Sequence, residues 1–164
     1  MGYKKYLKES RQSEEGQKLR KKRLIKWRRE PVSKRVDNPT KPERAKALGY
    51  KPVQGCFVVR HRISRGGRQR EQFKAGRRSK HMRRKKVLDM NYQEVAERRV
   101  AQKYCNCEVL GSYKVLKDGT KFWFEVVLAD PQQAQVSSKP SLAQPSSRKG
   151  KVFRGLTSAG KKSR

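Results

Sequence analysis

Acidic residues are scarce in this chain, and half of them lie in one short block. The 164 residues include 45 Lys and Arg against 14 Asp and Glu, which gives a formal net charge of +31 at pH 7. Seven of the acids fall within residues 87–131, beside six basic residues, so this block is close to neutral. Uncompensated charges of one sign repel one another in a compact state. We therefore expect one folded block flanked by polycationic segments.

The apolar content limits the size of the folded part and excludes several classes of protein. Apolar residues, Tyr included, make up 33% of the chain, which suits one modest domain with long polar extensions. No stretch approaches the roughly 20 apolar residues that a transmembrane helix needs, and the N-terminus lacks the apolar run of a secretory signal. Three cysteines cannot form a fully paired disulfide framework. We expect no membrane partner and a reducing compartment, cytosolic or nuclear.

The N-terminal part of the chain predicts helices joined by a linker. Residues 3–30 have helical composition with a break near Ser13 and Gly16, and Pro31 should stop the helix. Residues 37–42 contain two prolines and predict an extended linker. A short helix over 42–48 would end at Gly49, because glycine readily adopts the left-handed conformation that ends a helix.

Alternation of side chains predicts a strand over residues 53–63. One side of this strand carries Phe57, Val59, His61 and Ile63, and the other carries Cys56, Val58, Arg60 and Arg62. An apolar face backed by arginines is typical of a sheet with one side on a core and one on RNA. The turn at Arg65-Gly66-Gly67-Arg68 then leads into a basic run that ends at Lys86.

The neutral block gives the clearest structural pattern. Asn91 with Glu94 three residues later predicts a helix cap, and Tyr92, Ala96, Val100 and Tyr104 repeat on one helix face. Two strand-like runs, 109–116 and 122–128, flank Asp118-Gly119, a sequence that favours a hairpin because both residues tolerate positive φ. We expect the sheet to end at Asp130-Pro131 and its core face to carry Phe122, Phe124, Val126 and Leu128.

These elements together predict a small α+β domain with a mixed or antiparallel sheet, packed helices and long basic extensions. The expected division is a basic helical extension over 1–36, the domain over 37–131 with an inserted basic loop at about 64–86, and a tail over 132–164. Residues 132–147 are rich in Gln, Ser, Pro and Ala without an apolar period, so we expect an irregular basic C-terminal tail.

No catalytic or metal-binding constellation emerges from the residues. His61 alternates with core positions and His81 lies in a cationic run, so neither has an evident partner for acid–base chemistry. A zinc site of three cysteines and His61 is conceivable, but buried thiols near the hairpin fit the spacing of Cys105 and Cys107 better. Gly155 to Lys161 resembles a phosphate-binding loop, yet Lys162 stands where that motif needs Ser or Thr. We expect no enzyme activity, metal, cofactor or small-molecule substrate.

The basic residues indicate a polyanionic partner, most simply RNA. A nuclear localisation signal needs one short cluster, whereas cations here cover most of the chain. Aromatic residues lie among them and could stack on unpaired bases, namely Trp27, Tyr50, Phe57, Phe73 and Phe153. The RNA-binding candidates are Arg28, Arg29, Lys46, Lys51, Arg60, Arg62, Arg65, Arg68, Arg70, Arg77, Arg78, Lys80, Arg83, Arg84, Lys85, Lys86, Arg154, Lys161 and Lys162.

Three ordered blocks of sequence resemble one ribosomal protein family. The first block is Thr40 to Lys51 with Gln54-Gly55 and Arg65 to Arg68; the second is Ala96 to Arg99, Val109 to Tyr113, Asp118-Gly119 and Phe124 to Pro131; the third is Arg154 to Arg164. They resemble the large-subunit ribosomal protein fifteen of the archaeal/eukaryotic "e" type, and we expect an archaeal member. The family commonly has Asn where this chain has Gly111, has another pattern over 132–148, and continues past the third block with a basic tail.

The resemblance implies a structural constituent of the large ribosomal subunit that stabilises folded ribosomal RNA in the cytoplasm, with RNA and neighbouring ribosomal proteins as partners. It implies a small α+β domain, extensions threaded between RNA helices, and no catalysis. Charge alone also allows a DNA-binding architectural protein, although no helix-turn-helix, heptad-linked basic region or metal finger is present. An enzyme acting on RNA is a third alternative, which lacks a catalytic constellation.

Overall fold

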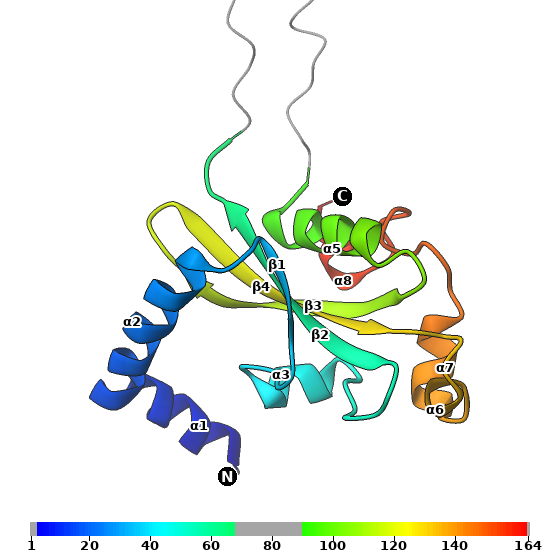
Figure 1. The fold of residues 1–164 in the computed structure, drawn as a ribbon, viewed down its shortest axis with the longest axis horizontal. Coiled ribbons are helices and arrows are strands. Elements are labelled where there is room, and N and C mark those ends of the chain that lie inside the picture. The colour runs from blue at the N-terminus through cyan, green and yellow to red at the C-terminus, as the bar shows by residue number, and fades with distance from the viewer. Residues whose placement is uncertain (1–2, 68–89, 164) are drawn as a thin grey trace, which may run out of the picture.

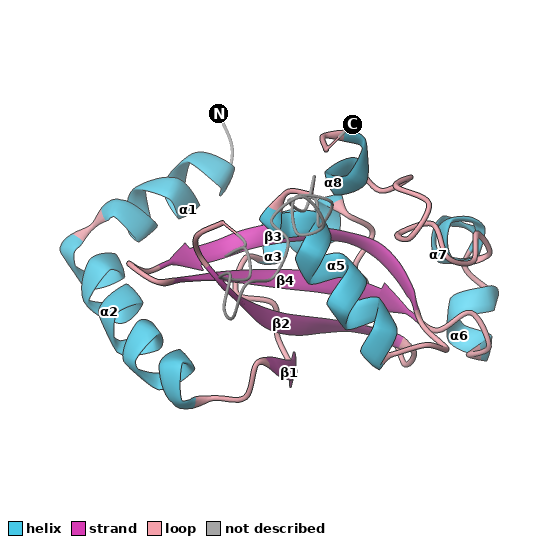
Figure 2. Cartoon of the chain, turned by 90° about the horizontal axis from the view of Figure 1, so that it is seen from above, coloured by secondary structure: helices cyan, strands magenta, loops and turns pink. Residues whose placement is uncertain are grey.

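A four-stranded antiparallel sheet organises the molecule (Figures 1 and 2). The computed structural model describes residues 3–67 and 90–163. The strands are β1 (Ser33–Val36), β2 (Cys56–Ser64), β3 (Glu108–Lys117) and β4 (Lys121–Ala129), in the spatial order β1-β2-β4-β3. Neighbouring strands are all antiparallel, and β4 lies between β2 and β3. The expected α+β class is therefore confirmed, with an antiparallel rather than a mixed sheet.

Side chains are buried on both faces of this sheet, which corrects the expectation of one core face and one RNA face. On the first face, helix α5 (Tyr92–Lys103) covers the alternating apolar residues of β2 and β4 (Figure 2), as predicted. On the second face, Val58 and Trp123 pack with residues of the flanking helices, including Trp27 and Leu142. Strands with both faces covered read as continuous apolar runs, and residues 123–129 are all buried.

Helix α5 begins at the predicted cap. The Asn91 side chain accepts a hydrogen bond from the backbone N–H of Glu94 at 2.8 Å, which satisfies one of the free donors of the first turn. Ala96 and Val100 on its inner face are fully buried, with Tyr92 and Tyr104 packed beside them. The predicted helix and its apolar face are both confirmed.

Two N-terminal helices lie at the end of the sheet opposite to α6 (Ala134–Ser137) and α7 (Pro140–Ser146) (Figure 2). They are α1 (Tyr3–Gln12) and α2 (Glu14–Arg29), and the predicted break lies at Ser13, whose side chain caps α2. A Cβ added at Gly16 would lie 2.3 Å from the Ser10 carbonyl oxygen, so only glycine allows this close approach of the two helices. Helix α2 ends just before Pro31, as expected.

The segment that follows contains one strand that the sequence did not predict. Strand β1 is four residues long and pairs with β2 at the edge of the sheet. After it, α3 (Pro42–Ala47) is the predicted short helix, and Gly49 follows it with φ of +92°. Left-handed backbone at Gly49 is the expected end of that helix.

The β3–β4 hairpin is confirmed, but its turn differs from the one expected. The Asp118 N–H donates to the Lys121 carbonyl at 2.8 Å, and the Asp118 carboxylate accepts from the Gly119 N–H at 2.7 Å. Positive φ occurs at Gly49, Gly55, Gly66, Gly150 and Gly155 but not at Gly119. The turn is therefore held by the Asp118 side chain, not by left-handed backbone at both residues.

The C-terminal segment is packed and partly helical, which corrects the expectation of an irregular tail. It contains α6 (Ala134–Ser137), α7 (Pro140–Ser146) and α8 (Ser158–Lys161). Val136 and Leu142 are fully buried against the second face of the sheet, and Val152 joins the core beneath α5. One buried apolar residue in each of α6 and α7, which are four and seven residues long, leaves no repeating apolar pattern in the sequence.

Candidate nucleic-acid interface

Three glutamates are buried among the described residues, and two of them bind hydroxyl groups inside the protein. Glu97 on α5 accepts from Ser112 and from Thr157 Oγ1, the latter at 2.6 Å. Glu125 on β4 accepts from the Tyr113 hydroxyl at 2.6 Å and from the Thr40 N–H at 3.0 Å. Burial raises the pKa of Glu97 above its usual range. Neither carboxylate is available to neutralise cations on the surface.

Other acids are held by cations of the same chain. Arg11 binds Glu43 with two hydrogen bonds, 2.6 and 2.8 Å long, and this ion pair lowers the pKa of the Glu43 carboxyl. Arg98 binds Glu94 on α5 at 2.8 Å. Because these acids are engaged internally, most of the exposed Lys and Arg side chains within residues 3–67 and 90–163 face solvent without a compensating carboxylate.

Cations gather at the end of the β3–β4 hairpin. Arg28 Nε donates to Asp118 Oδ2 at 2.8 Å, and Arg65 Nη1 donates to the Asp118 carbonyl at 2.8 Å. Arg62 Nη1 donates to the Arg28 carbonyl at 2.8 Å. Three of the residues predicted from sequence, from α2, from β2 and from the position after β2, are thus brought together beside Asp118. We call the set Arg28, Arg62, Arg65, Lys114 and Lys117 the hairpin-end cluster.

Lys114 and Lys117 of β3 complete this cluster, although the sequence did not single them out. The Lys114 ammonium lies 4.4 Å from the centre of the Phe122 ring, and the Arg65 guanidinium lies 5.0 Å from the same ring. Burial, followed by the nearby charges of Lys117 and Arg65, lowers the pKa of Lys114. The repulsion from these neighbouring charges disfavours the charged state of Lys114 and would be relieved by a bound anion.

Arg60, also predicted to contact RNA, lies inside the protein. Its side chain is 7% exposed, it forms an ion pair with Glu30, and its guanidinium stacks 4.0 Å from the Trp27 ring centre. Trp27 lies on α2 and Glu30 is the residue that ends this helix, so the docking of α2 covers the face of β2 that carries Arg60. Alternation along the strand identified the face correctly, but it did not show what covers that face.

The other predicted basic residues are spread over the described surface. Arg29 and Lys46 are exposed, and Lys51 donates to Ser141 Oγ at 2.6 Å. Lys161 and Lys162 are exposed at the C-terminal end, and exposed Arg154 donates to the Lys149 carbonyl at 2.7 Å. The remaining candidates lie outside the described residues: Arg68, Arg70, Arg77, Arg78, Lys80, Arg83, Arg84, Lys85 and Lys86.

Most of the aromatic residues proposed to stack on bases contribute to the protein interior instead. Trp27 is 4% exposed and lies 6.3 Å from Trp123, ring centre to ring centre. Tyr50 and Phe57 pack against the two core clusters. Phe153 is 46% exposed and is available to a base, whereas Phe73 lies outside the described residues.

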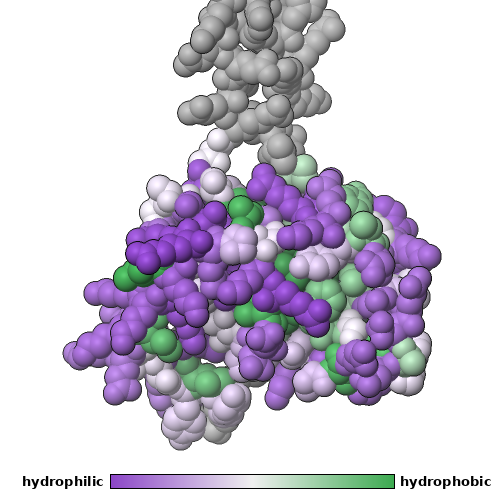
Figure 3. All heavy atoms as spheres, in the orientation of Figure 1, coloured by the Kyte–Doolittle hydropathy of each residue, from purple (hydrophilic) through white to green (hydrophobic). Residues whose placement is uncertain are grey.

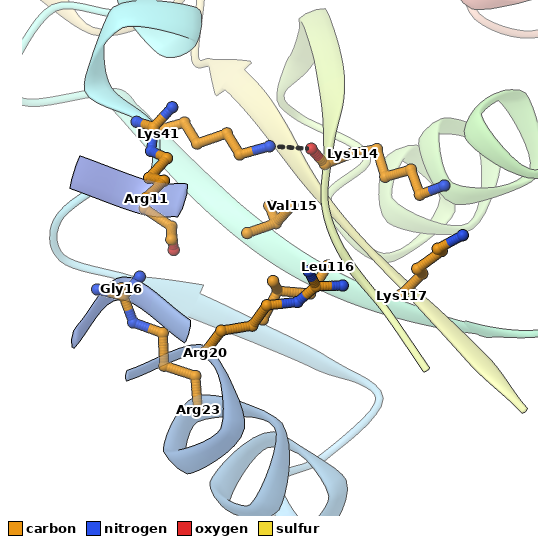
Figure 4. A pocket seen from close by; sticks show the side chains of 10 residues that line it. Arg11, Gly16, Arg20, Arg23, Lys41, Lys114, Val115, Leu116 and Lys117 are labelled. Atoms are coloured by element: carbon orange, nitrogen blue, oxygen red, sulfur yellow. Dashed lines mark hydrogen bonds between the residues drawn. The ribbon is translucent and has the colours of Figure 1, made fainter. Parts of the chain in front are cut away.

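A cationic cavity lies where the two N-terminal helices meet the sheet (Figure 4). Its volume is about 380 Å³, and its walls include Arg11, Arg20, Arg23, Lys41 and Val115. The sequence analysis named none of these residues. The spacing of Arg20, Arg23 and Trp27 places all three on one face of α2, but only the docking of that helix on β3 creates a cavity.

The described residues assemble neither a catalytic nor a metal site. His61 is buried, shares a 2.7 Å hydrogen bond with Ser33 Oγ, and has its pKa lowered to about 4 by burial first and then by Arg99, Lys103 and Arg62. Cys56 and Cys107 belong to the cores on opposite faces of the sheet, and Cys105 is exposed. Over residues 3–67 and 90–163, no three His, Cys, Asp or Glu side chains converge on a metal position.

The Gly155–Lys161 segment is a structural turn. Thr157 caps the four-residue helix α8, and a Cβ at Gly160 would lie 2.7 Å from Gly155 Cα. The two glycines therefore allow a close backbone contact rather than a phosphate cradle. Within the same described ranges, no helix is both long and apolar enough to cross a bilayer.

A small α+β protein with buried glutamates, a largely hydrophilic surface (Figure 3) and a net charge of +31 is typical of the class of proteins that lie against a polyanion. A family profile described as Ribosomal L15 matches residues 1–164. One similar protein is the large ribosomal subunit protein eL15 of Nanoarchaeum equitans, 46% identical over 149 residues, 89% of this chain and 78% of that protein. The protein of the same name from Methanocella arvoryzae is 43% identical over 145 residues, 87% of this chain and 74% of that protein. The chain belongs to the Ribosomal L15e family and is of the archaeal type.

Proposed function

We propose that this protein is a structural constituent of the large ribosomal subunit and holds ribosomal RNA through its exposed cations. Membership of the Ribosomal L15e family carries this proposal. The cytoplasmic location expected of such subunits and a role in translation follow from the same membership. The architectural DNA-binding alternative is not favoured, because the family and both relatives are ribosomal.

The proposed contact surface is the hairpin-end cluster together with the exposed cations Arg29, Lys46, Lys161 and Lys162. Each phosphate that a Lys or Arg neutralises releases counterions, and the affinity falls by roughly 0.7 to 0.9 log units per tenfold increase in salt for each such contact. Backbone contacts position the protein without reading sequence. Selectivity then comes from the shape of the folded RNA and from stacking on exposed rings such as Phe153. No step of this role requires catalysis.

Neighbouring ribosomal proteins are further proposed partners. Tyr3, Tyr6, Leu19 and Ile25 of α1 and α2 are between 47% and 67% exposed. Large apolar side chains on an otherwise polar surface are typical of contact sites.

Sucrose-gradient fractionation of a native lysate, with mass spectrometry of each fraction, tests the assignment. We expect the chain in the large-subunit fraction, and we expect it to stay there through a moderate salt wash. Finding it with DNA, or free of the subunit, would overturn the proposal.

A second experiment tests the surface with matched double variants. Lys114→Gln with Lys117→Gln removes two charges from the hairpin-end cluster, and Arg99→Gln with Lys103→Gln removes two exposed charges from α5. We expect the first pair to weaken binding to large-subunit RNA. We also expect it to reduce the dependence of the affinity on salt by the amount that corresponds to about two phosphate contacts. Equal losses for both pairs would show that the hairpin-end cluster has no special part in binding.

A further inference from the structure

The cationic cavity shares Lys114 and Lys117 with the hairpin-end cluster, but its other lining residues have no role in the proposed surface. It is lined by Gly16 in the first turn of α2, by Thr40 and Lys41 before α3, and by Val115 and Leu116 of β3. Its volume of about 380 Å³ falls within the range of small-molecule sites, roughly 300–1,000 Å³. None of the residues that line it is acidic. A cavity with cationic walls and an apolar floor suits a ligand that combines an anion with a ring.

Two of its cations are held in place by the protein. Arg11 is fixed by its two hydrogen bonds to Glu43, and Lys41 Nζ donates to the Lys114 carbonyl at 2.9 Å (Figure 4). Burial first, and then the charge of Arg11, lowers the pKa of Lys41. The protein therefore holds a partly desolvated ammonium beside a guanidinium at one side of the cavity.

Two further cations of the cavity, on α2, have side chains that are not engaged by the described part of the protein. Arg20 and Arg23 form no hydrogen bond or ion pair within the described part of the chain. The Arg20 side chain extends from α2 toward Leu116, and Arg23 turns toward Gly16 (Figure 4). By contrast, Lys114 and Lys117 extend from β3 away from Arg11 and Gly16 (Figure 4). The arginines of α2 are thus the donors left for a ligand.

We propose that this cavity holds one nucleotide of a single-stranded RNA segment, with its phosphate on Arg20, Arg23 and Lys41. Arginine suits this role because its planar fork binds two phosphate oxygens at once. The sugar and base would lie over Val115 and Leu116, and a guanidinium plane can stack on a base. A base-paired nucleotide would first have to leave its helix to enter. This inference rests on the proposed function and adds the class of RNA structure that is recognised.

Methyl NMR of the full-length protein tests the site, with the methyl groups of Val115 and Leu116 as local reporters. The probe is adenosine 5′-monophosphate, compared with adenosine and with inorganic phosphate. We expect saturable shifts with the nucleotide and much weaker responses to either part alone. An equal response to inorganic phosphate would show an anion site without nucleotide recognition and would overturn the proposal.

Matched variants separate the cavity from the overall charge. Arg20→Gln with Arg23→Gln should weaken the nucleotide response by about tenfold or more, because charge-assisted hydrogen bonds are lost. Lys18→Gln with Lys22→Gln removes two exposed charges from the opposite side of α2 and should change it by less than about twofold. Similar losses for the two pairs would mean that the response reports long-range charge, which contradicts a specific site.

The source of the nucleotide is tested with RNA itself. A short single-stranded oligoadenylate should shift the same methyl groups and compete with the mononucleotide, whereas a duplex with the same number of nucleotides should not. Competition by polyglutamate but not by oligoadenylate would assign the cavity to an acidic peptide and overturn the proposal. If the protein sediments with the large subunit but single-stranded RNA leaves the methyl groups unshifted, the nucleotide site is wrong and the ribosomal role stands. If the protein does not sediment with the subunit, the ribosomal role itself fails.

Discussion

The carboxylate of Glu97 joins three parts of the chain that are far apart in sequence. It lies on α5 and accepts hydrogen bonds from Ser112 on β3 and from Thr157, which in turn accepts from the Gly160 N–H at 3.1 Å. A buried carboxylate needs such partners, because burial without them is costly. The C-terminal turn is therefore attached to the domain by a polar contact as well as by apolar packing.

Replacing Thr157 with Val tests this attachment. The change removes a donor to Glu97 and the cap of α8 while keeping the side-chain shape, so we expect a loss of about 1–3 kcal/mol in the free energy of unfolding. Urea titration followed by circular dichroism measures it. Ser158→Ala, at the exposed neighbouring position, is the control and should be close to neutral. A Thr157→Val protein as stable as the control would show that Glu97 does not anchor the turn.

His61 gives the protein a pH-dependent stability. Its pKa is lowered to about 4 in the folded state from an ordinary value of 6.5. Between pH 6.5 and pH 4, His61 is protonated in the unfolded chain but stays neutral in the folded protein. The free energy of unfolding therefore falls as the pH falls. The loss approaches about 1.4 kcal/mol for each pH unit in that window.

The comparison protein for this prediction is His61→Asn, which keeps a polar group near Ser33 but does not titrate. The raised pKa of Glu97 acts in the opposite direction, yet it is common to both proteins and cancels in the difference. We expect the wild type to lose stability relative to the variant as the pH is lowered from 6.5 to 4. Parallel stability curves from urea titrations across this range would contradict a neutral, buried imidazole.

Helix α7 contributes to the core, although an irregular tail was expected from the sequence in this segment. Leu142 on this helix is fully buried with Trp123 and Val136 in the same cluster. We expect Leu142→Ala to lower the free energy of unfolding by about 2–5 kcal/mol, because it leaves a cavity in a packed core. Gln144→Ala on the exposed side of the same helix is the matched control. Equal and small effects of the two changes in urea titrations would mean that the segment is not part of the cooperative fold.

The elements predictable from sequence are those with a local signature. The Asn91 cap, the apolar face of α5 and the Asp118-Gly119 hairpin each depend on residues a few positions apart. Strand β1 and helices α6 and α7 were not predictable, because each is short and owes its conformation to partners elsewhere in the chain. The same reason explains why one face of the sheet was assigned to RNA: its covering helices come from both ends of the chain.

From the sequence, the candidate site could be predicted only as a set of cationic residues, without their arrangement in space. Charge placed Arg28, Arg62 and Arg65 among the RNA-binding residues, and the structure brings these three together. It also placed Arg60 there, although Glu30 and Trp27 enclose that side chain. Arg20, Arg23 and Lys41 became candidates only once the helices were docked. A sequence shows which side chains are cationic, whereas tertiary packing decides which of them remain free.

At the scale of the whole molecule, the charge of +31 opposes folding of the isolated chain. Added salt shortens the range of this repulsion, from about 10 Å at 0.1 M to about 3 Å at 1 M. We therefore expect the melting temperature of the free protein to rise as sodium chloride is added, even though surface ion pairs weaken. Differential scanning calorimetry over a salt series measures this.

A charge-reversed variant provides the control for the salt series. Lys18→Glu with Lys22→Glu changes two exposed residues on α2 and lowers the net charge by four, from +31 to +27. We expect it to melt at a higher temperature than the wild type in low salt and to respond less to added salt. A melting temperature that falls with salt in both proteins would show that specific ion pairs outweigh the overall repulsion.

The pairing of Trp27 with Trp123 gives the protein a built-in optical probe. These are its only two tryptophans, their ring centres are 6.3 Å apart, and both are buried. All intrinsic tryptophan emission thus originates at the junction between α2 and the sheet, beneath the Arg60 guanidinium. A red shift of that emission would report separation of the N-terminal helix from the strands, without any label. During assembly with RNA, an unchanged spectrum would show that this junction forms before the protein meets its partner.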